Sequence, residues 1–402
     1  MKRRRVKITG VGPVTPAGVG REEFWKGILE PVSRVRPFTA LGEQNGPLAA
    51  AFLSKFDIRK FVPDRGLVPN GAGRHTLFAI AGAILALRDA GVSVEELRQS
   101  PAAIVTGSSL MDFGSIGSTI EAVQKRGPRA AQPRTIYSMG ISSVPSAINQ
   151  SLGLNARTMA VSTQCSAGLD AIGYAVDLVA TCEAEIALCG GTDAPLRQFP
   201  MLEFRAASLT PATIEMAARL CRPFDLWRTT GVVSEGACML VVEPESSPRR
   251  GYSFISGYAF ANDDDTLCSG IAAANRLAIA EAGLKAGDVD LISAWGPGHK
   301  KIDAAEAQAL SAVFGAGLQE IPVVAVTGAL GTALGGAPAI QVGMSALAQQ
   351  SEQIPPTVNW EFPDPDCPLN LSSAVRFVRH QTTLINAHGA GGVNASMILE
   401  RC

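Results

Sequence analysis

The chain has 402 residues, of which 47% are hydrophobic and 18% are charged, and its formal net charge is −1. This length and apolar content allow a large core and more than one domain, while the near-neutral charge favours neither nucleic acid nor an anionic membrane as a partner. No apolar run approaches the roughly 18 residues that a membrane helix needs, and the eight cysteines lack the spacing of a zinc site. We therefore expect no membrane span, no metal and a cytoplasmic protein with reduced thiols.

Segments with the pattern of strands and helices alternate along the chain, which favours an α/β fold. A predicted helix at 77–90 followed by a predicted strand at 102–106 has a counterpart at 271–282 and 289–294. Such an internal repeat indicates two copies of one α/β unit. The Pro- and Ser-containing segment 243–251 is the natural joint, so we predict an N-terminal half at 1–248 and a C-terminal half at 249–402.

Cys165 lies where a predicted strand turns into a predicted helix. The apolar run 158–161 predicts a buried strand, and from Ser166 onward small and apolar residues follow helical spacing. At such a turn the helix dipole and free backbone N–H groups are expected to lower the thiol pKa and bind an oxyanion. The alternative is that Cys165 is only a small buried apolar residue.

A similar strand and helix pair occurs in the second half, with a predicted strand at 323–326 and a helix rich in small residues at 332–348. Equivalent turns of two related halves are expected to face one another. This arrangement predicts that Cys165 lies opposite the Gly331-Thr332 turn.

Four segments, in this order along the chain, resemble motifs of the β-ketoacyl-acyl-carrier-protein synthase family: 8–18, 162–168, 222–237 and 389–396. The resemblance implies a thiolase-like fold, with two duplicated α/β halves in a layered αβαβα arrangement. In that family a cysteine accepts an acyl group from the phosphopantetheine of an acyl-carrier protein. A malonyl thioester is then decarboxylated, and its carbanion attacks the acyl-cysteine. The resemblance implies no cofactor beyond the carrier's own phosphopantetheine.

The first histidine of the family, which begins a His-Gly-Thr-x-Thr motif, is missing. Asp303 and Glu306 match the family's acidic positions and align this stretch, and Trp295 then stands where the histidine belongs. Pro297 and His299 replace the two threonines. An indole N–H can donate one hydrogen bond but cannot accept a proton, so Trp295 does not replace the histidine.

The second histidine and the lysine belong to a Lys-x-x-x-Gly-His stretch that corresponds to 327–332. Thr332 stands for the histidine and Thr327 for the lysine. A threonine hydroxyl is a poor base at neutral pH. Because the apparatus that stabilises the enolate is gone, efficient decarboxylative condensation is not expected.

Two other histidines are candidates to act in their place. His388 precedes the glycine loop that lines the pocket floor in the family, and His299 lies in the same loop as Trp295. In that glycine loop, which continues with Gly391 and Gly392, Ala390 replaces the family's gating phenylalanine. The alternative for both histidines is packing within a loop or exposure to solvent.

These substitutions leave three functions open. The segments 335–338 and 354–359 resemble chain-length factors, which are partner subunits of active ketosynthases, although those proteins usually lack the cysteine. The second function is an acyltransferase that uses Cys165 without decarboxylation. The third is a condensing enzyme rebuilt around His388 or His299.

The resemblance also implies partners. It implies an acyl-carrier protein as partner and a dimer, either with a second copy or with an active ketosynthase. The basic run 125–129, together with Arg134, is either a docking site for an acidic carrier or a solvated loop.

Overall fold

The computed structural model describes residues 3–42, 46–62 and 68–402. Within these residues, eleven strands form one hydrogen-bonded sheet that consists of two runs of five strands and the short strand β2 (Gly18–Val19) at the end of β1. The first run, in spatial order, is β1 (Val6–Thr15), β8 (Gly236–Pro244), β7 (Ile186–Asp193), β5 (Ala102–Gly107) and β6 (Arg157–Val161). The second is β9 (Ser253–Asn262), β15 (Val393–Arg401), β14 (Thr382–Gly389), β10 (Leu291–Ser293) and β11 (Val323–Val324).

The two runs have the same topology. In each, the first two neighbouring pairs are antiparallel and the last two are parallel. They meet where β1 pairs with β9 over three residue pairs. The predicted duplication is thus confirmed in the strand order. The chain passes from β8 to β9 between residues 244 and 253, and the division at 248 stays a prediction.

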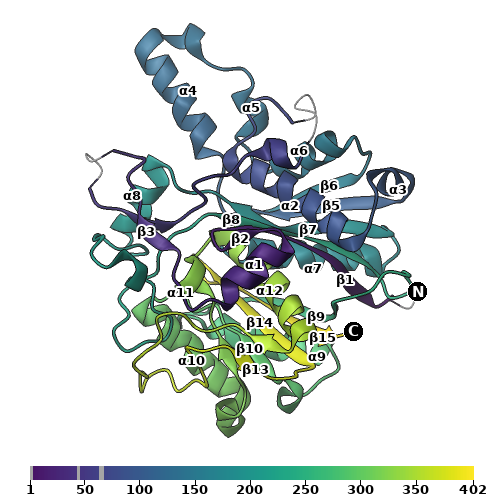
Figure 1. Ribbon diagram of the computed structural model, residues 1–402, viewed down its shortest axis with the longest axis vertical. Helices are drawn as coiled ribbons and strands as arrows, with labels where there is room; N and C mark the ends of the chain where they lie inside the picture. The colour runs from purple at the N-terminus through teal and green to yellow at the C-terminus, as the bar shows by residue number, and fades with distance from the viewer. Residues whose placement is uncertain (1–2, 43–45, 63–67) are drawn as a thin grey trace.

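Helices form the remaining three layers of the molecule (Figure 1). Between the two runs of strands lie α7 (Ala167–Ala180) and α12 (Ala337–Ser351), which are in contact and are buried on nearly every side. Helices α2 (Arg74–Ala90) and α6 (Ser143–Leu152) cover the outer face of the first run, while α9 (Ser269–Glu281) and α10 (Lys300–Phe314) lie outside the second. An αβαβα arrangement results.

The remaining elements connect or border these layers. The helices are α1 (Arg21–Leu29), α3 (Val94–Gln99), α8 (Gln198–Ala206) and α11 (Thr327–Leu330). Two small hairpins are formed by β3 (Val35–Pro37) with β4 (Ala49–Ala51) and by β12 (Gln353–Ile354) with β13 (Arg376–Phe377). No helix in the described ranges is long and apolar enough to cross a bilayer.

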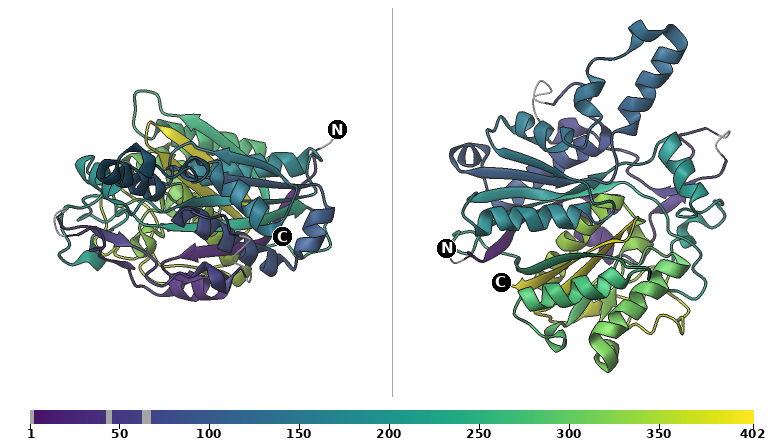
Figure 2. Two further views of the ribbon diagram at one scale, coloured as in Figure 1. Left: turned by 90° about the horizontal axis from the view of Figure 1, so that it is seen from above. Right: turned by 180° about the vertical axis from the view of Figure 1, so that it is seen from behind.

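An arm projects from the N-terminal half, away from the rest of the molecule (Figures 1 and 2). It consists of α4 (Phe113–Arg126), a short turn at 128–130 and α5 (Thr135–Ser138). The side chains of Lys125, Arg126 and Arg129 are exposed near its end. The basic run therefore has the exposure expected of a solvated loop, and that exposure also leaves it open to a partner.

Two expected elements differ in the structure. The strand expected to be buried at 158–161 is β6, which is half-buried to exposed because it is the last strand of the sheet. The helix expected from 332 begins only at Ala337. Thr332 is held in an extended segment instead, where its N–H donates to the carbonyl of Val232 at 2.8 Å and its carbonyl accepts from the N–H of Ser234 at 2.9 Å.

Candidate active site

Cys165 occupies the turn between β6 and α7, as predicted. The preceding residue, Gln164, has a φ of 54°, a left-handed conformation that is costly for a residue with a side chain. Gly389 at the end of β14 packs directly on this turn, since a Cβ atom there would lie 2.9 Å from the Cβ of Gln164 and 3.1 Å from the backbone nitrogen of Cys165. The turn is thus held in its strained conformation by tight packing from the second half.

A buried carboxylate lies beneath the turn and was not identified from the sequence. Asp170 accepts a hydrogen bond from the Tyr258 hydroxyl at 2.8 Å, another from the Thr163 hydroxyl, and a longer one from Ser166 at 3.4 Å. Burial raises the pKa of Asp170 in spite of these donors. The network joins the turn before and after Cys165 to β9. A charged residue in the first turn of the helix 167–180, whose other residues apart from Tyr174 and Asp177 are small or apolar, was the available signal.

The structure brings six of the sequence-predicted residues together around one cavity of about 160 Å³: Cys165, Trp295, His299, Thr332, His388 and Ala390. The remaining walls are mostly apolar. Thr332 therefore does lie on the same cavity as Cys165, as the duplication predicted. Thr327, Gly391 and Gly392 do not line this cavity.

The Cys165 thiol differs from expectation. Burial, together with the nearby charge of Asp193, raises its pKa to about 12, although the Ser109 hydroxyl and the backbone N–H groups of Ala390 and Cys165 itself act in the opposite direction. The predicted lowering of the pKa is therefore wrong. No hydrogen bond within the described part of the chain joins this thiol to His299 or His388, so no imidazole draws the proton away.

Asp193, at the end of β7, is a second buried carboxylate that the sequence did not reveal. It accepts hydrogen bonds from the Ser108 hydroxyl (2.9 Å) and from the N–H groups of Ser109 (2.8 Å), Leu110 (3.2 Å) and Gly335 (2.8 Å). Burial nevertheless raises the pKa of Asp193 to about 6. The carboxylate ties the loop beside Cys165 to the turn before α12.

We expect Cys165 to react slowly with iodoacetamide, and increasingly fast with pH. With a thiol pKa near 12, the thiolate fraction at pH 8 is about 10³-fold below that of an ordinary cysteine, which its greater nucleophilicity offsets in part. The net rate is expected to be on the order of 50-fold below that of a short cysteine peptide. The rate should rise about tenfold per pH unit from pH 7 to 10.

Peptide mass spectrometry, with Cys165→Ala to identify the peptide, measures this rate. A rate that levels off near pH 7 would show an activated thiolate and would contradict the raised pKa.

Thr327 and Thr332 stand at the positions where the resemblance places a lysine and a histidine. The Thr327 hydroxyl donates to the carbonyl of Gly296, next to Trp295, and so connects α11 to the loop that carries the indole. The Thr332 hydroxyl is buried and has no hydrogen-bond partner among the described residues. Neither side chain supplies a charge or a base to the cavity.

Glu306 and Asp303 hold the loop at 295–299 by hydrogen bonds to its backbone. They are the two acidic residues that match this stretch to the family's motif. Glu306 accepts from the N–H groups of Trp295 (2.8 Å) and Gly296 (2.9 Å). Asp303 accepts from those of Gly298 and His299, both at 3.1 Å. Trp295 is almost fully buried by this arrangement.

His299 serves as the N-cap of α10. Its Nδ1 accepts a hydrogen bond from the N–H of Ile302 at 3.4 Å. Burial, followed by the charges of Lys301 and Arg228, lowers the pKa of His299. The His299 imidazole is therefore a neutral helix cap, and it also borders the cavity.

His388 also borders the cavity, and its contact with Asn394 fixes its tautomer. Asn394 donates from Nδ2 to Asp263, Gly392 and Ala261, so its Oδ1 is the acceptor of the 2.7 Å contact with Nδ1 of His388. The proton of His388 therefore lies on Nδ1, and Nε2 is the nitrogen that can accept another.

Ala390, at the position of the family's gate, is exposed at the border of the cavity. Gly391 and Gly392 continue the turn with φ of 84° and 78°.

All eight cysteines are free thiols. In residues 3–42, 46–62 and 68–402, no group of three or more His, Cys, Asp and Glu side chains is arranged to hold a metal ion.

Comparison with known proteins identifies relatives of this chain. The family model for the beta-ketoacyl synthase N-terminal domain matches residues 3–247, and the family model for the C-terminal domain matches residues 252–361. A putative polyketide beta-ketoacyl synthase 1 of Streptomyces virginiae is 30% identical, with 99% of this chain and 98% of that protein covered. The 3-oxoacyl-acyl-carrier-protein synthase 2 of Coxiella burnetii is 28% identical, with 100% and 99% covered.

Among solved structures, the ishigamide ketosynthase/chain length factor superposes with a TM-score of 0.91 at 31% identity, and each chain is covered completely. The overall architecture is therefore the thiolase-type fold that the sequence resemblance implied.

Proposed function

The chain belongs to the β-ketoacyl synthase family of fatty-acid and polyketide biosynthesis, and from that premise we propose that it is a non-condensing partner subunit of an active ketosynthase, in the manner of a chain-length factor. Such a subunit needs the fold and the interface of the family but not its decarboxylation chemistry.

The composition of the cavity beside Cys165 carries this proposal. Trp295 and Thr332 occupy the two places that would stabilise an enolate, and neither can take up or release a proton at neutral pH. The thiol itself, with a pKa raised to about 12, is almost entirely protonated at that pH. A site without a thiolate and without imidazoles at these two places supports a role in binding and shaping rather than in condensation.

The exposed surfaces support a partner. Strand β6 leaves one edge of the sheet unpaired, and unpaired edges favour strand addition. Ile136 and Tyr137 of the arm, which adjoin one another, are 68% and 82% exposed, and adjoining exposed apolar side chains favour contact with a partner. The solved relative named above is, by its own description, a ketosynthase/chain length factor. We propose the same kind of pairing here, together with an acyl-carrier protein that serves the complex.

One observation favours a second candidate, an acyltransferase that uses Cys165 without decarboxylation. The backbone N–H groups of Cys165 and Ala390 both lie beside the thiol sulfur. Two convergent N–H groups are what an acyl-enzyme requires to stabilise a tetrahedral oxyanion. This part of the family's chemistry is independent of the missing histidines.

Co-purification tests the partner proposal. We expect a tagged copy to recover a synthase that carries both histidines, in a 1:1 complex by native mass spectrometry. Tyr137→Asp should weaken this complex at least tenfold, because the charge must be desolvated in an apolar interface. Leu277→Asp, at an exposed apolar position on α9 (54% exposed), is the control and should leave it unchanged.

The acyl-enzyme candidate has its own readout. Incubation with acyl-carrier thioesters of several chain lengths would give a mass adduct that is absent in Cys165→Ala. No adduct at any length rejects the acyltransferase. No complex with any complete synthase, even at micromolar concentration, rejects the partner subunit.

A further inference from the structure

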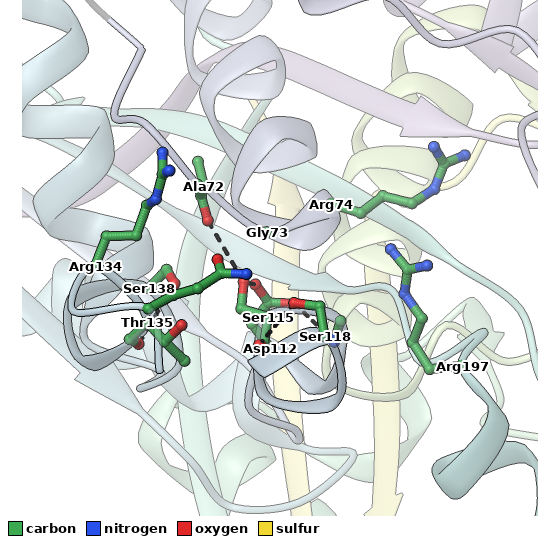
Figure 3. A pocket seen from close by; sticks show the side chains of 13 residues that line it. Ala72, Gly73, Arg74, Asp112, Ser115, Ser118, Arg134, Thr135, Ser138 and Arg197 are labelled. Carbon is green, nitrogen blue, oxygen red and sulfur yellow. Dashed lines mark hydrogen bonds between the residues drawn. The ribbon is translucent and has the colours of Figure 1, made fainter. Parts of the chain in front are cut away.

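A second cavity, of about 340 Å³, lies at the base of the arm and plays no part in the site around Cys165. It is enclosed by the start of α2, the first turn of α4, residues 132–138 and Arg197, which precedes α8 (Figure 3). Its lining is polar: three arginines, Asp112 and several hydroxyls take most of the positions. A lining of this kind is suited to a polar or charged ligand rather than to an apolar one.

The three arginines differ in their partners, and Arg134 and Arg197 are exposed to solvent. Arg74 is paired with Glu235, at 2.6 Å to both carboxylate oxygens. Within the described part of the chain, by contrast, the side chains of Arg134 and Arg197 make no hydrogen bond and no ion pair. Figure 3 shows them on opposite sides of the cavity.

Both arginines pass close to a glycine. The stem of Arg134 lies against Gly71, whose Cβ position would be 3.1 Å from the arginine Cδ. The guanidinium of Arg197 covers Gly114 in the first turn of α4, with Nε 3.0 Å and Nη2 3.1 Å from the Cβ position. The Asp112 carboxylate lies at the same place, with Oδ1 3.1 Å from that Cβ position, so it partly balances the guanidinium beside the positive end of α4.

Asp112 adds a selective element. Its carboxylate is nearly buried in the wall, where it accepts from the N–H of Gly114 at 3.1 Å and from the Ser115 hydroxyl. A carboxylate retains lone pairs for a further donor, and it repels an anion that has no proton to share. The hydroxyls of Ser118, Thr135 and Ser138 complete the lining and can donate or accept.

We propose that this cavity binds a phosphate group that still carries a proton, either inorganic phosphate or a phosphate monoester. Arg134 and Arg197 supply the forked donors that match phosphate oxygens, and Asp112 accepts from the P–O–H. Sulfate has the same size and charge but no proton at neutral pH, so it would meet Asp112 as an unpaired acceptor. A phosphodiester has the same defect.

Isothermal titration of the 402-residue protein with sodium phosphate, sodium sulfate, O-phosphoserine and dimethyl phosphate, at constant ionic strength and pH 5.5, where inorganic phosphate and most of the monoester carry a proton, tests this proposal. We expect saturable phosphate binding at least tenfold tighter than that of sulfate. If inorganic phosphate binds as well as O-phosphoserine, the free ion is sufficient. If O-phosphoserine binds more tightly, a monoester is the better ligand, and both results support the site. Dimethyl phosphate should bind at least tenfold more weakly than O-phosphoserine.

Three variants and a control complete the test. Arg134→Gln and Arg197→Gln should each weaken phosphate binding about tenfold or more. Asp112→Asn keeps the helix cap and should abolish the preference for phosphate over sulfate. Arg126→Gln removes an exposed charge from the same arm outside the cavity and should have no effect. Equal affinity for phosphate and sulfate, no saturable phosphate binding, or affinity unchanged in both arginine variants would overturn the proposal.

Discussion

Malonyl-carrier protein is expected to lose carbon dioxide between about 10² and 10⁴ times more slowly with this protein than with an active β-ketoacyl synthase. Each of the two imidazoles that the family resemblance places at Trp295 and Thr332 would account for a factor of about 10²–10³, and losses within one site are not additive. Trp295 and Thr332 both border the cavity that contains Cys165, so no imidazole stands at these two places to bind the enolate or exchange a proton with it. Release of labelled carbon dioxide, with an active synthase assayed in parallel, measures the difference.

Restoring the imidazoles tests the cause of this loss. The double substitution Trp295→His with Thr332→His should raise carbon dioxide release at least tenfold above that of the unmodified protein. Trp295→Phe with Thr332→Val changes the same two side chains without adding a base and should not raise it. If the unmodified protein instead releases carbon dioxide at a rate within tenfold of the active synthase, and His388→Asn or His299→Asn abolishes this release, the condensing site has been rebuilt and the non-condensing proposal is wrong.

Arg228→Met is expected to reduce the free energy of unfolding by about 3–5 kcal/mol, because it leaves buried carboxylates without their cation. The Arg228 guanidinium donates to Asp364 and to the carbonyls of Asp225 (2.9 Å) and Lys300 (3.1 Å). Its Nε lies 3.7 Å from Asp303. Equilibrium urea unfolding measures the loss, and Arg126→Met, at an exposed position, should change stability by less than about 0.5 kcal/mol.

The same variant is expected to show a distinctive pH dependence. Burial raises the pKa of Asp303 to about 7, which outweighs the N–H donors and the charge of Arg228. In the unfolded chain this pKa is about 3.9. The folded state therefore binds more protons between these values, and the contribution of Asp303 to stability falls as pH rises from about 4 to 7. Without Arg228 this pKa rises further, so the variant should lose more stability at pH 8 than at pH 5. A loss that is the same at both pH values would show that Asp303 does not respond to Arg228.

Much of the fold could be predicted because its duplication is visible in local patterns. The helices at 77–90 and 271–282 and the strands that follow them correspond to α2, β5, α9 and β10, within a few residues at each end. The strand order repeats accordingly. The cavity, too, follows from the duplication, which predicted that Cys165 and Thr332 would face one another.

What could not be predicted depends on neighbours that are distant in sequence. The raised thiol pKa comes from burial and from Asp193, 28 residues away in the chain and on another strand. Asp170 acquires its role only through Tyr258 of the second half. The burial of 158–161 was overestimated because an apolar run does not reveal whether its strand lies inside a sheet or at its edge.

That edge has a consequence for the cell that makes this protein. A copy of the chain that finds no partner leaves the outer side of β6 open to other strands, including those of misfolded chains, and such an edge promotes aggregation. On the proposed pairing, synthesis in excess of the partner would leave this edge open, whereas balanced synthesis would protect both chains. Stoichiometric expression, as from a shared transcript, is the arrangement that this exposed strand favours.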